Sequence, residues 1–190
     1  MGLDIHLTTN NSEEIFQKEN TNNHIDYFNQ HSLSRTFCNL MSRKDVIEEE
    51  TELDQISRLT DTDISVLYEM EQYWSEDEVD FHLSFAETEN DKQKVSEQIA
   101  RNRKKIDGNI DRVLTTIETL IEKLSHFDLH DKLNSHGLDT LGYDYYFTDF
   151  DLDKGEGYIG NNFGQDLRNF RRYLEHAKAN GANAVWFNYG

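Results

Sequence analysis

The chain has 190 residues, a formal net charge of −18, 12% aromatic residues and a single cysteine, Cys38. A chain of this length can bury roughly 70% of its unfolded surface, so its aromatic content favours a folded domain over a disordered chain despite the charge. The single cysteine excludes an internal disulfide, and the absence of a signal-peptide pattern and of any apolar run near ~20 residues predicts a soluble, cytoplasmic protein without membrane contact.

The N-terminal quarter contains one predicted strand and one predicted helix. Residues 3–8 alternate apolar and polar side chains, which is typical of a half-buried strand. A polar stretch rich in Asn follows. In residues 31–42, apolar side chains recur at helical spacing and predict a helix with one buried face. These side chains are Leu33, Phe37, Leu40 and Met41.

Residues 45–91 form an acidic segment. They hold 17 acidic side chains and one basic side chain, Arg58, so the segment carries a charge of −16. Apolar side chains at helical spacing predict two amphipathic helices. Leu53, Ile56 and Leu59 mark the first, and Ile64, Leu67, Met70 and Trp74 mark the second. In residues 79–85 the period changes to strict alternation, which predicts a half-buried strand.

Residues 91–127 are predicted to form one long central helix. Their apolar side chains are separated by alternating steps of three and four: Ile110, Val113, Ile117, Leu120, Leu124 and Phe127. Gly108 lies inside this helix and marks a candidate bend. At ~1.5 Å per residue, some 35 residues span roughly 50 Å, which is longer than a small domain needs. A homodimer that pairs this helix with a second copy is therefore part of the prediction.

The C-terminal part contains a glycine-rich connection at 149–160, a helix that opens near Gly164 and closes at Gly181, and a terminal strand over 182–190. The predicted fold class is α+β: a small, mostly antiparallel sheet packed by several helices. The chain is predicted to be a single domain over 1–190, with its acidic helical segment at 45–91.

The glycine-rich connection reads DFDLDKGEGYIG. Neither register of an EF-hand loop fits it, because glycine and the final glutamate fall at the wrong positions. Gly155, Gly157 and Gly160 match a dinucleotide-binding pattern, but the acidic neighbours would repel a pyrophosphate. The favoured interpretation is a hairpin or a strand-to-helix connection whose glycines supply positive φ.

A cation site is the alternative for the same segment. On a strand, Asp149, Asp151 and Asp153 would point three carboxylates the same way, and the chain would then be a divalent-cation-dependent enzyme or cation-binding protein. His126 and His130, four residues apart, have the spacing with which one helix face chelates zinc. Histidines at this spacing more often lie at the end of a helix, where they interact favourably with the helix dipole, and bind no metal. No catalytic motif is found, so the sequence favours a non-enzyme without a cofactor.

Four segments carry a resemblance to a known group. The opening MGLDI, the helix HSLSRTFCNLM, the segment GYDYYF and the terminal AVWFNYG have a layout that resembles short phage and prophage proteins beginning Met-Gly-Leu-Asp. The resemblance brings no catalytic residue and does not include the acidic segment. It implies a mobile-element origin, where acidic proteins that mimic nucleic acid and inhibit host defence are a recurrent solution.

The charge of the acidic segment suggests its function. Duplex DNA carries one charge per ~1.7 Å of axis, and acidic helices and a strand packed side by side would approach that density. The sequence therefore predicts a protein that binds the basic groove of a nucleic-acid-handling protein and does not itself bind nucleic acid. The predicted contact residues are Glu48, Glu49, Glu50, Glu52, Asp54, Asp61, Asp63, Glu69, Glu71, Glu76, Asp77, Glu78 and Asp80.

Overall fold

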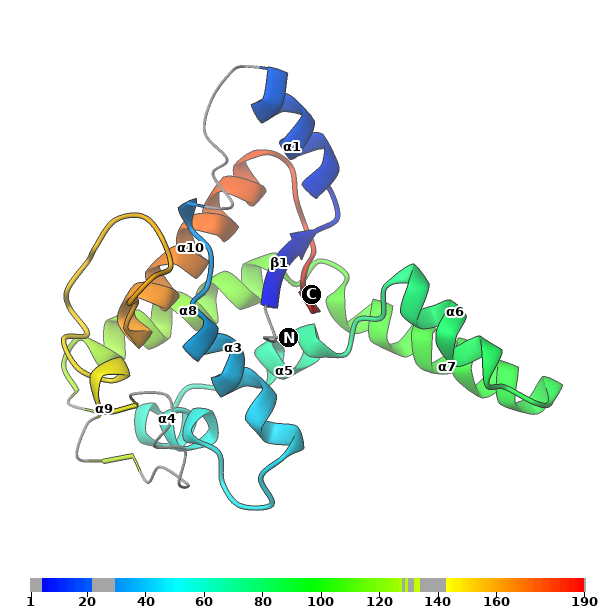
Figure 1. Cartoon of the computed structure of the whole chain (residues 1–190), viewed down its shortest axis with the longest axis horizontal. Coiled ribbons are helices and arrows are strands. Elements are labelled where there is room, and N and C mark those ends of the chain that lie inside the picture. The colour runs from blue at the N-terminus through cyan, green and yellow to red at the C-terminus, as the bar shows by residue number, and fades with distance from the viewer. Residues whose placement is uncertain (1–4, 22–29, 128, 130–131, 134–142, 190) are drawn as a thin grey trace.

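The computed structural model describes residues 5–21, 30–127, 129, 132–133 and 143–189. Two short strands, β1 (Ile5–Thr9) and β2 (Val185–Tyr189), form an antiparallel sheet in which Ile5 pairs with Tyr189 and Thr9 pairs with Val185. The two terminal segments of the chain are therefore neighbours in the sheet (Figure 1). The predicted strands at both ends are confirmed.

Helices make up most of the rest of the described chain, which confirms the α+β class. In chain order they are α1 (Ser12–Thr21), α3 (Arg35–Ser42), the 3-10 helix η1 (Arg43–Asp45), α4 (Glu52–Thr60), α5 (Ser65–Glu71), α6 (Glu76–Ser84), α7 (Glu89–Ile106), α8 (Ile110–Leu124), α9 (Tyr143–Tyr146) and α10 (Phe163–Ala179). The predicted helix at 31–42 begins later, at Arg35, because the side chain of Ser34 caps it by accepting from the Phe37 N–H. Among the described residues, every helix is too short or too polar to span a lipid bilayer.

The core lies where α8 and α10 pack against each other and against the sheet. Both helices bury the apolar stripe that their sequences predict: Ile110, Val113, Ile117, Leu120 and Leu124 on α8, and Leu167, Phe170, Leu174 and Ala177 on α10. The ring of Phe170 lies 6.2 Å from that of Phe37 on α3 and 5.9 Å from that of Phe187 on β2. One buried aromatic side chain thus joins two helices and the sheet.

The predicted long helix over 91–127 is wrong, because the chain turns between α7 and α8. Gly108 at the turn has a φ of 65°. Next to it, the buried side-chain amide of Asn109 donates to the Val185 carbonyl and accepts from the Val185 N–H, both at 2.8 Å. Asn109 therefore pairs with β2 as a neighbouring strand would, and this anchor fixes the break in the helix.

The predicted strand over 79–85 is also wrong, because residues 79–84 belong to α6 and Phe85 is its C-cap residue. The side chain of Ser75 accepts from the Glu78 N–H while the side chain of Glu78 accepts from the Ser75 N–H, a capping box that starts a helix. α6 and α7 pack together as a helical hairpin, residues 76–106, that projects from the rest of the molecule (Figure 1). We call this hairpin the arm and the remainder the body.

The base of the arm is fixed to the body by polar contacts. The buried side chain of Asn102 on α7 donates to the Gln72 carbonyl at 2.6 Å, just after α5. Lys105 Nζ donates to the Gln72 side chain at 2.9 Å. Further out, Val95 and Ile99 of α7 are only partly buried. The arm is thus well anchored at its base and thinly packed beyond it.

Candidate functional site

The structure divides the acidic segment between the body and the arm. α4 packs on α3 and α8, and α5 packs on β2 and α8, whereas α6 packs on α7. α4 lies at the lower left of the view and α6 at the right (Figure 1). The charge density expected from side-by-side packing therefore does not apply to the whole segment, and the body and the arm are considered in turn.

One predicted contact residue is removed by burial. The carboxylate of Glu52 is fully buried, and its Oε2 lies 2.9 Å from Nε of the buried Arg43. A buried carboxylate that already neutralises a buried guanidinium is closed to a partner protein. The inclusion of Glu52 among the contact residues is thus corrected, since an acidic first turn on α4 gave no sign that this side chain points inward.

Several other body carboxylates already have partners in the chain. Asp54 accepts from the hydroxyl of Tyr68 at 2.8 Å and from Lys44 at 3.3 Å. Burial raises the pKa of Asp54, but the hydrogen bonds from Tyr68, Thr51 and Lys44 outweigh it and hold that pKa below its usual value. These contacts make the outer face of α4 a locally paired surface.

Two more pairs complete that picture. Arg58 donates two hydrogen bonds to the carboxylate of Glu50, from Nε at 2.9 Å and from Nη2 at 3.1 Å. Glu69 on α5 lies 3.3 Å from Arg112 on α8. Both pairs are partly or largely exposed, where an ion pair contributes little to stability. Breaking these two pairs therefore costs little free energy.

The remaining predicted residues of the body are distributed around it. Glu48, Glu49, Asp61 and Asp63 are exposed, and Glu71 is half-buried. Asp61 ends α4 in a left-handed conformation with a φ of 48°, and the carboxylate of Asp63 accepts from the Ser65 N–H at 2.9 Å. That hydrogen bond lowers the pKa of Asp63. These acids are accessible but do not share one element.

The arm presents its acids differently. Glu76, Glu78 and Asp80 on α6 are all exposed. Asp77 belongs to the same helix, and its side chain lies outside the described part of the structure. Within the described residues, Glu76 and Asp80 form no ion pair and no hydrogen bond through their side chains. The arm therefore carries free carboxylates within one helix.

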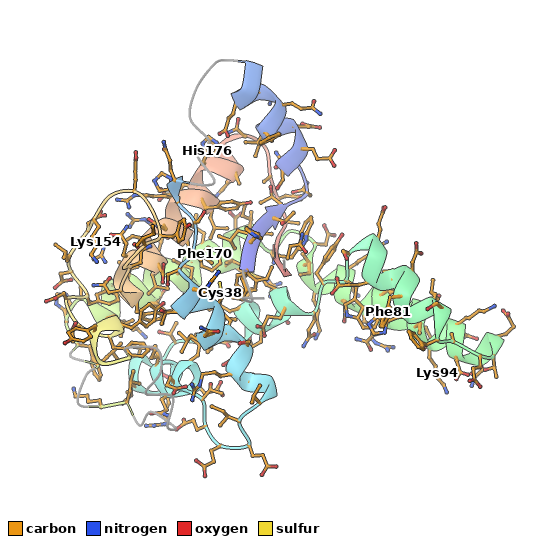
Figure 2. The ribbon with its side chains drawn as sticks, in the orientation of Figure 1. Cys38, Phe81, Lys94, Lys154, Phe170 and His176 are labelled. Atoms are coloured by element: carbon orange, nitrogen blue, oxygen red, sulfur yellow. The ribbon has the colours of Figure 1, made fainter. Side chains whose placement is uncertain are left out.

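An exposed aromatic pair lies on the same helix, and sequence reasoning missed it. Phe81 and Phe85 are 59% and 69% exposed, and their rings meet edge-on with centroids 4.8 Å apart. Figure 2 labels Phe81 on the arm. As a strand, residues 79–85 would have buried both rings. The helix separates them by four residues and brings them to one outward face.

Residues 149–160 form the connection between α9 and α10. Gly155, Gly157 and Gly160 have φ values of 83°, 90° and 69°, which confirms that these glycines supply positive φ. No strand precedes them in the described part of the connection. Side chains of α10 hold the loop: Gln165 accepts from the Lys154 N–H at 2.5 Å, and Arg172 donates to the Gly155 carbonyl at 2.9 Å.

The three aspartates of this connection do not converge. Asp153 accepts from Arg172 at 2.5 Å, which lowers its pKa, and Asp151 lies 4.0 Å from Arg168. The strand that would align them with Asp149 is absent. Among the described residues, no group of three or more His, Cys, Asp or Glu side chains is arranged to hold a metal ion. The strand arrangement expected for the alternative cation site is therefore wrong, and cation binding by these residues remains a prediction.

The histidine pair is only half described. His126 is exposed just after the end of α8. His130 lies outside the described residues, so the zinc spacing predicted for the two remains a prediction. The continuous helix on which the predicted dimer was based is replaced by α8, packed in the core, and α7, in the arm, and the dimer itself remains a prediction.

Comparisons with protein-family models, with curated protein sequences and with solved structures find no match for this chain. Its functional interpretation therefore depends on its own side chains.

Proposed function

We propose that this chain is a non-enzymatic interaction protein whose arm binds a basic, nucleic-acid-handling protein and blocks its nucleic-acid groove. The observation that carries the proposal is the combination on α6 of an exposed aromatic pair, Phe81 and Phe85, with the free carboxylates of Glu76 and Asp80. An acidic helix that only promotes solubility needs no exposed phenyl rings.

The two kinds of side chain have separate roles in binding. Buried aromatic anchors supply most of the affinity of typical interfaces, and surrounding charges set the association rate and the choice of partner. The edge-to-face rings of Phe81 and Phe85 form a small apolar protrusion that fits a shallow pocket on a partner protein. The carboxylates beside them favour a pocket rimmed by Lys and Arg. Lys and Arg are also the side chains with which proteins neutralise the phosphate backbone of nucleic acid.

Charge supports an inhibitory role. Residues 45–75, the part of the acidic segment that lies in the body, hold ten acidic side chains and Arg58, a charge of −9, so the body adds a long-range attraction to a basic partner. A bound arm would occupy phosphate-binding side chains and compete with nucleic acid. The layout that resembles phage and prophage proteins supports an inhibitor of host defence. No side chain is assigned a catalytic role, and a location in the cytoplasm would give access to such a partner.

The test combines capture with matched variants. The tagged chain is used to capture proteins from host lysate at low and high salt, and the captured protein is purified and its affinity measured. The F81A/F85A variant removes the rings, and E76Q/D80N removes the free charges. A control variant, E118Q/E122Q, removes two exposed acids of α8, outside the acidic segment.

The proposal predicts a basic nucleic-acid-binding partner that duplex DNA displaces. Loss of both rings is expected to weaken binding roughly 10–100-fold, as for typical aromatic anchors. Loss of both charges mainly slows association and reduces its salt dependence, while the control variant binds as the wild type does. Equal binding by all variants, or a partner that salt and DNA do not displace, contradicts the proposal. Sedimentation tests for a dimer, and a dimer that F81A/F85A dissociates would assign the rings to a second copy instead.

A further inference from the structure

A cavity of about 560 Å³ opens on the body, far from the arm in sequence. Three segments enclose it: the start of β1, residues 32–38 at the start of α3, and residues 158–161 before α10. This volume is within the ~300–1,000 Å³ of typical small-molecule sites. Its walls combine buried apolar side chains, such as Ile5 and Leu33, with several polar ones.

Two of these walls are held by one buried side chain of α10. Asp166 is fully buried and accepts from the Ser34 N–H at 2.9 Å, from the Ser34 hydroxyl at 2.5 Å and from the Asn161 amide at 3.0 Å. The hydroxyl of Tyr146 donates to it as well, at 2.7 Å. Ser34 and Asn161 both line the cavity and come from different segments of its wall, so Asp166 fixes their separation.

A second buried side chain repeats the arrangement one turn further along α10. The amide of Asn169 donates to the Ser32 carbonyl at 3.1 Å and to the Gly157 carbonyl at 2.8 Å. The Gly157 N–H in turn donates to the Gln30 carbonyl at 2.6 Å. The loop and the segment before α3 are thus tied together by hydrogen bonds, and the cavity is preformed.

Burial of these polar groups needs a reason beyond stability. A buried carboxylate is costly even when fully hydrogen-bonded, and apolar side chains of similar size are often as stabilising. Polar groups that break this pattern are typical of sites where geometry is needed for binding. Here the fixed geometry is that of the cavity walls.

The cavity differs in charge from the rest of the surface. The chain has 37 acidic residues, yet none of the described residues that line the cavity is acidic. Arg35 and His6, both exposed, line it instead. The outer rim is apolar, with Tyr158 half-exposed and Ile159 86% exposed. In a molecule of charge −18, such a cavity is a local exception that favours an anion.

We propose that this cavity binds a small organic anion with an apolar or aromatic body. Arg35 and His6 contact the anionic group, because arginine pairs well with carboxylate and phosphate oxygens. Tyr158 and Ile159 cover the body of the ligand at the rim. The site is independent of the arm and of the partner proposed for it.

The experiment uses phenyl phosphate and benzoate as probes, with inorganic phosphate and benzyl alcohol as controls. Binding is measured by calorimetry and by amide chemical shifts. R35Q removes the guanidinium, and R103Q is its control, since Arg103 is exposed on the arm and does not line the cavity. I159D adds a negative charge at an exposed position that the fold does not need, and I159N is its neutral counterpart.

The proposal expects one or both organic anions to bind and to shift the amides of Tyr158, Ile159 and Asn161. R35Q and I159D should weaken this binding at least tenfold, whereas R103Q and I159N stay within about twofold of the wild type. Binding of neither anion at millimolar concentration overturns the proposal. So does binding that R35Q and I159D leave unchanged, or equal binding of benzyl alcohol. If inorganic phosphate binds as tightly as phenyl phosphate, the proposal that the ligand has an apolar body is overturned.

Discussion

The buried carboxylate of Asp166 allows the sharpest test of how α10 organises the body. Replacement by alanine removes the acceptor for the Ser34 N–H, the Ser34 hydroxyl, the Tyr146 hydroxyl and the Asn161 amide. Ser34 and Tyr146 are buried, so water does not readily replace the lost partner. The variant is therefore expected to destabilise the fold.

The magnitude follows from the number of groups left without a partner. Asn161 keeps its second hydrogen bond, to the Gly157 carbonyl at 3.0 Å. The Ser34 N–H and the Tyr146 hydroxyl each lose their hydrogen bond to Asp166, at about 1–3 kcal/mol for each buried group whose acceptor is removed. The alanine variant no longer has the free-energy cost of burying a carboxyl group, and this gain offsets part of the loss. We expect Asp166→Ala to lower the free energy of unfolding by about 2–4 kcal/mol, and Asp166→Asn by roughly half as much, since one oxygen still accepts.

Urea denaturation near neutral pH measures both variants against the wild type. Asp151→Ala is the matched control, because the carboxylate of Asp151 is largely exposed and its nearest basic atom, on Arg168, is 4.0 Å away. Its effect should stay within about 0.5 kcal/mol. A loss below about 1 kcal/mol for Asp166→Ala would refute the argument that this side chain holds the two walls together.

The pH dependence of stability isolates the ionisation of the same group. Burial raises the pKa of Asp166, although hydrogen bonds from Ser34, Asn161 and Tyr146 oppose the shift. The folded state then binds this proton more tightly than the unfolded chain, whose aspartates titrate near about 3.9. The stabilising contribution is full below that pH and is lost as pH rises through the folded pKa. The stability of the wild type relative to Asp166→Asn should therefore fall from about pH 4 upward, and a difference that rises with pH would contradict this.

Three further substitutions test other parts of the structure by urea denaturation. Asn109→Ala leaves the buried Val185 N–H and carbonyl without their 2.8 Å partners and should cost about 2–3 kcal/mol; a neutral effect would contradict the anchor that breaks the helix. Glu52→Ala leaves the buried guanidinium of Arg43 without its carboxylate and should lower the free energy of unfolding by about 3–5 kcal/mol. A loss below about 1 kcal/mol is typical of a solvent-exposed pair and would contradict the burial of this one. Gly164→Ala should destabilise by about 1–3 kcal/mol despite the better helix propensity of alanine, because its Cβ would lie 2.2 Å from the Phe150 carbonyl oxygen; a more stable variant would contradict that close approach.

Amphipathic helices and terminal strands were predictable from the sequence because burial imposes a period on their apolar side chains. The stripes of α8 and α10, the two helices at 52–60 and 65–71, and β1 and β2 follow this rule. α1 was not predicted, since Ile15 alone is buried among its described side chains and its residues have no clear apolar stripe. Periodicity thus finds elements that face the core and misses those that hardly touch it.

The break at 107–109 shows a different limit. The helical stripe continues from Ile106 to Ile110 across it, so the apolar pattern alone favours one helix. Asp107, Gly108 and Asn109 are residues typical of turns, and they outweigh the stripe. What makes the turn stable is the contact of Asn109 with Val185, 76 residues away, which no local pattern contains.

The candidate sites were predictable only in their charge. Composition located the acidic segment, but whether a carboxylate is free, paired or buried depends on partners distant in sequence, such as Arg112 for Glu69. For the cavity, Ser34 and Asp166 are separated by 132 residues. Contacts between residues that are this far apart in the sequence decide which charged side chains a partner protein can reach.

The assignment of residues 79–85 to a helix rather than a strand changes the functional hypothesis. In a strand, Phe81 and Phe85 would join the core, and only charge would remain at the surface, so binding would be a matter of Coulomb attraction that salt removes. In α6 both rings face outward beside Asp80. Binding through the arm should therefore retain an apolar component at high salt, where screening has removed the contribution of the acids. That residual affinity, and its loss in F81A/F85A alone, distinguishes an arm that docks from a surface that is merely negative.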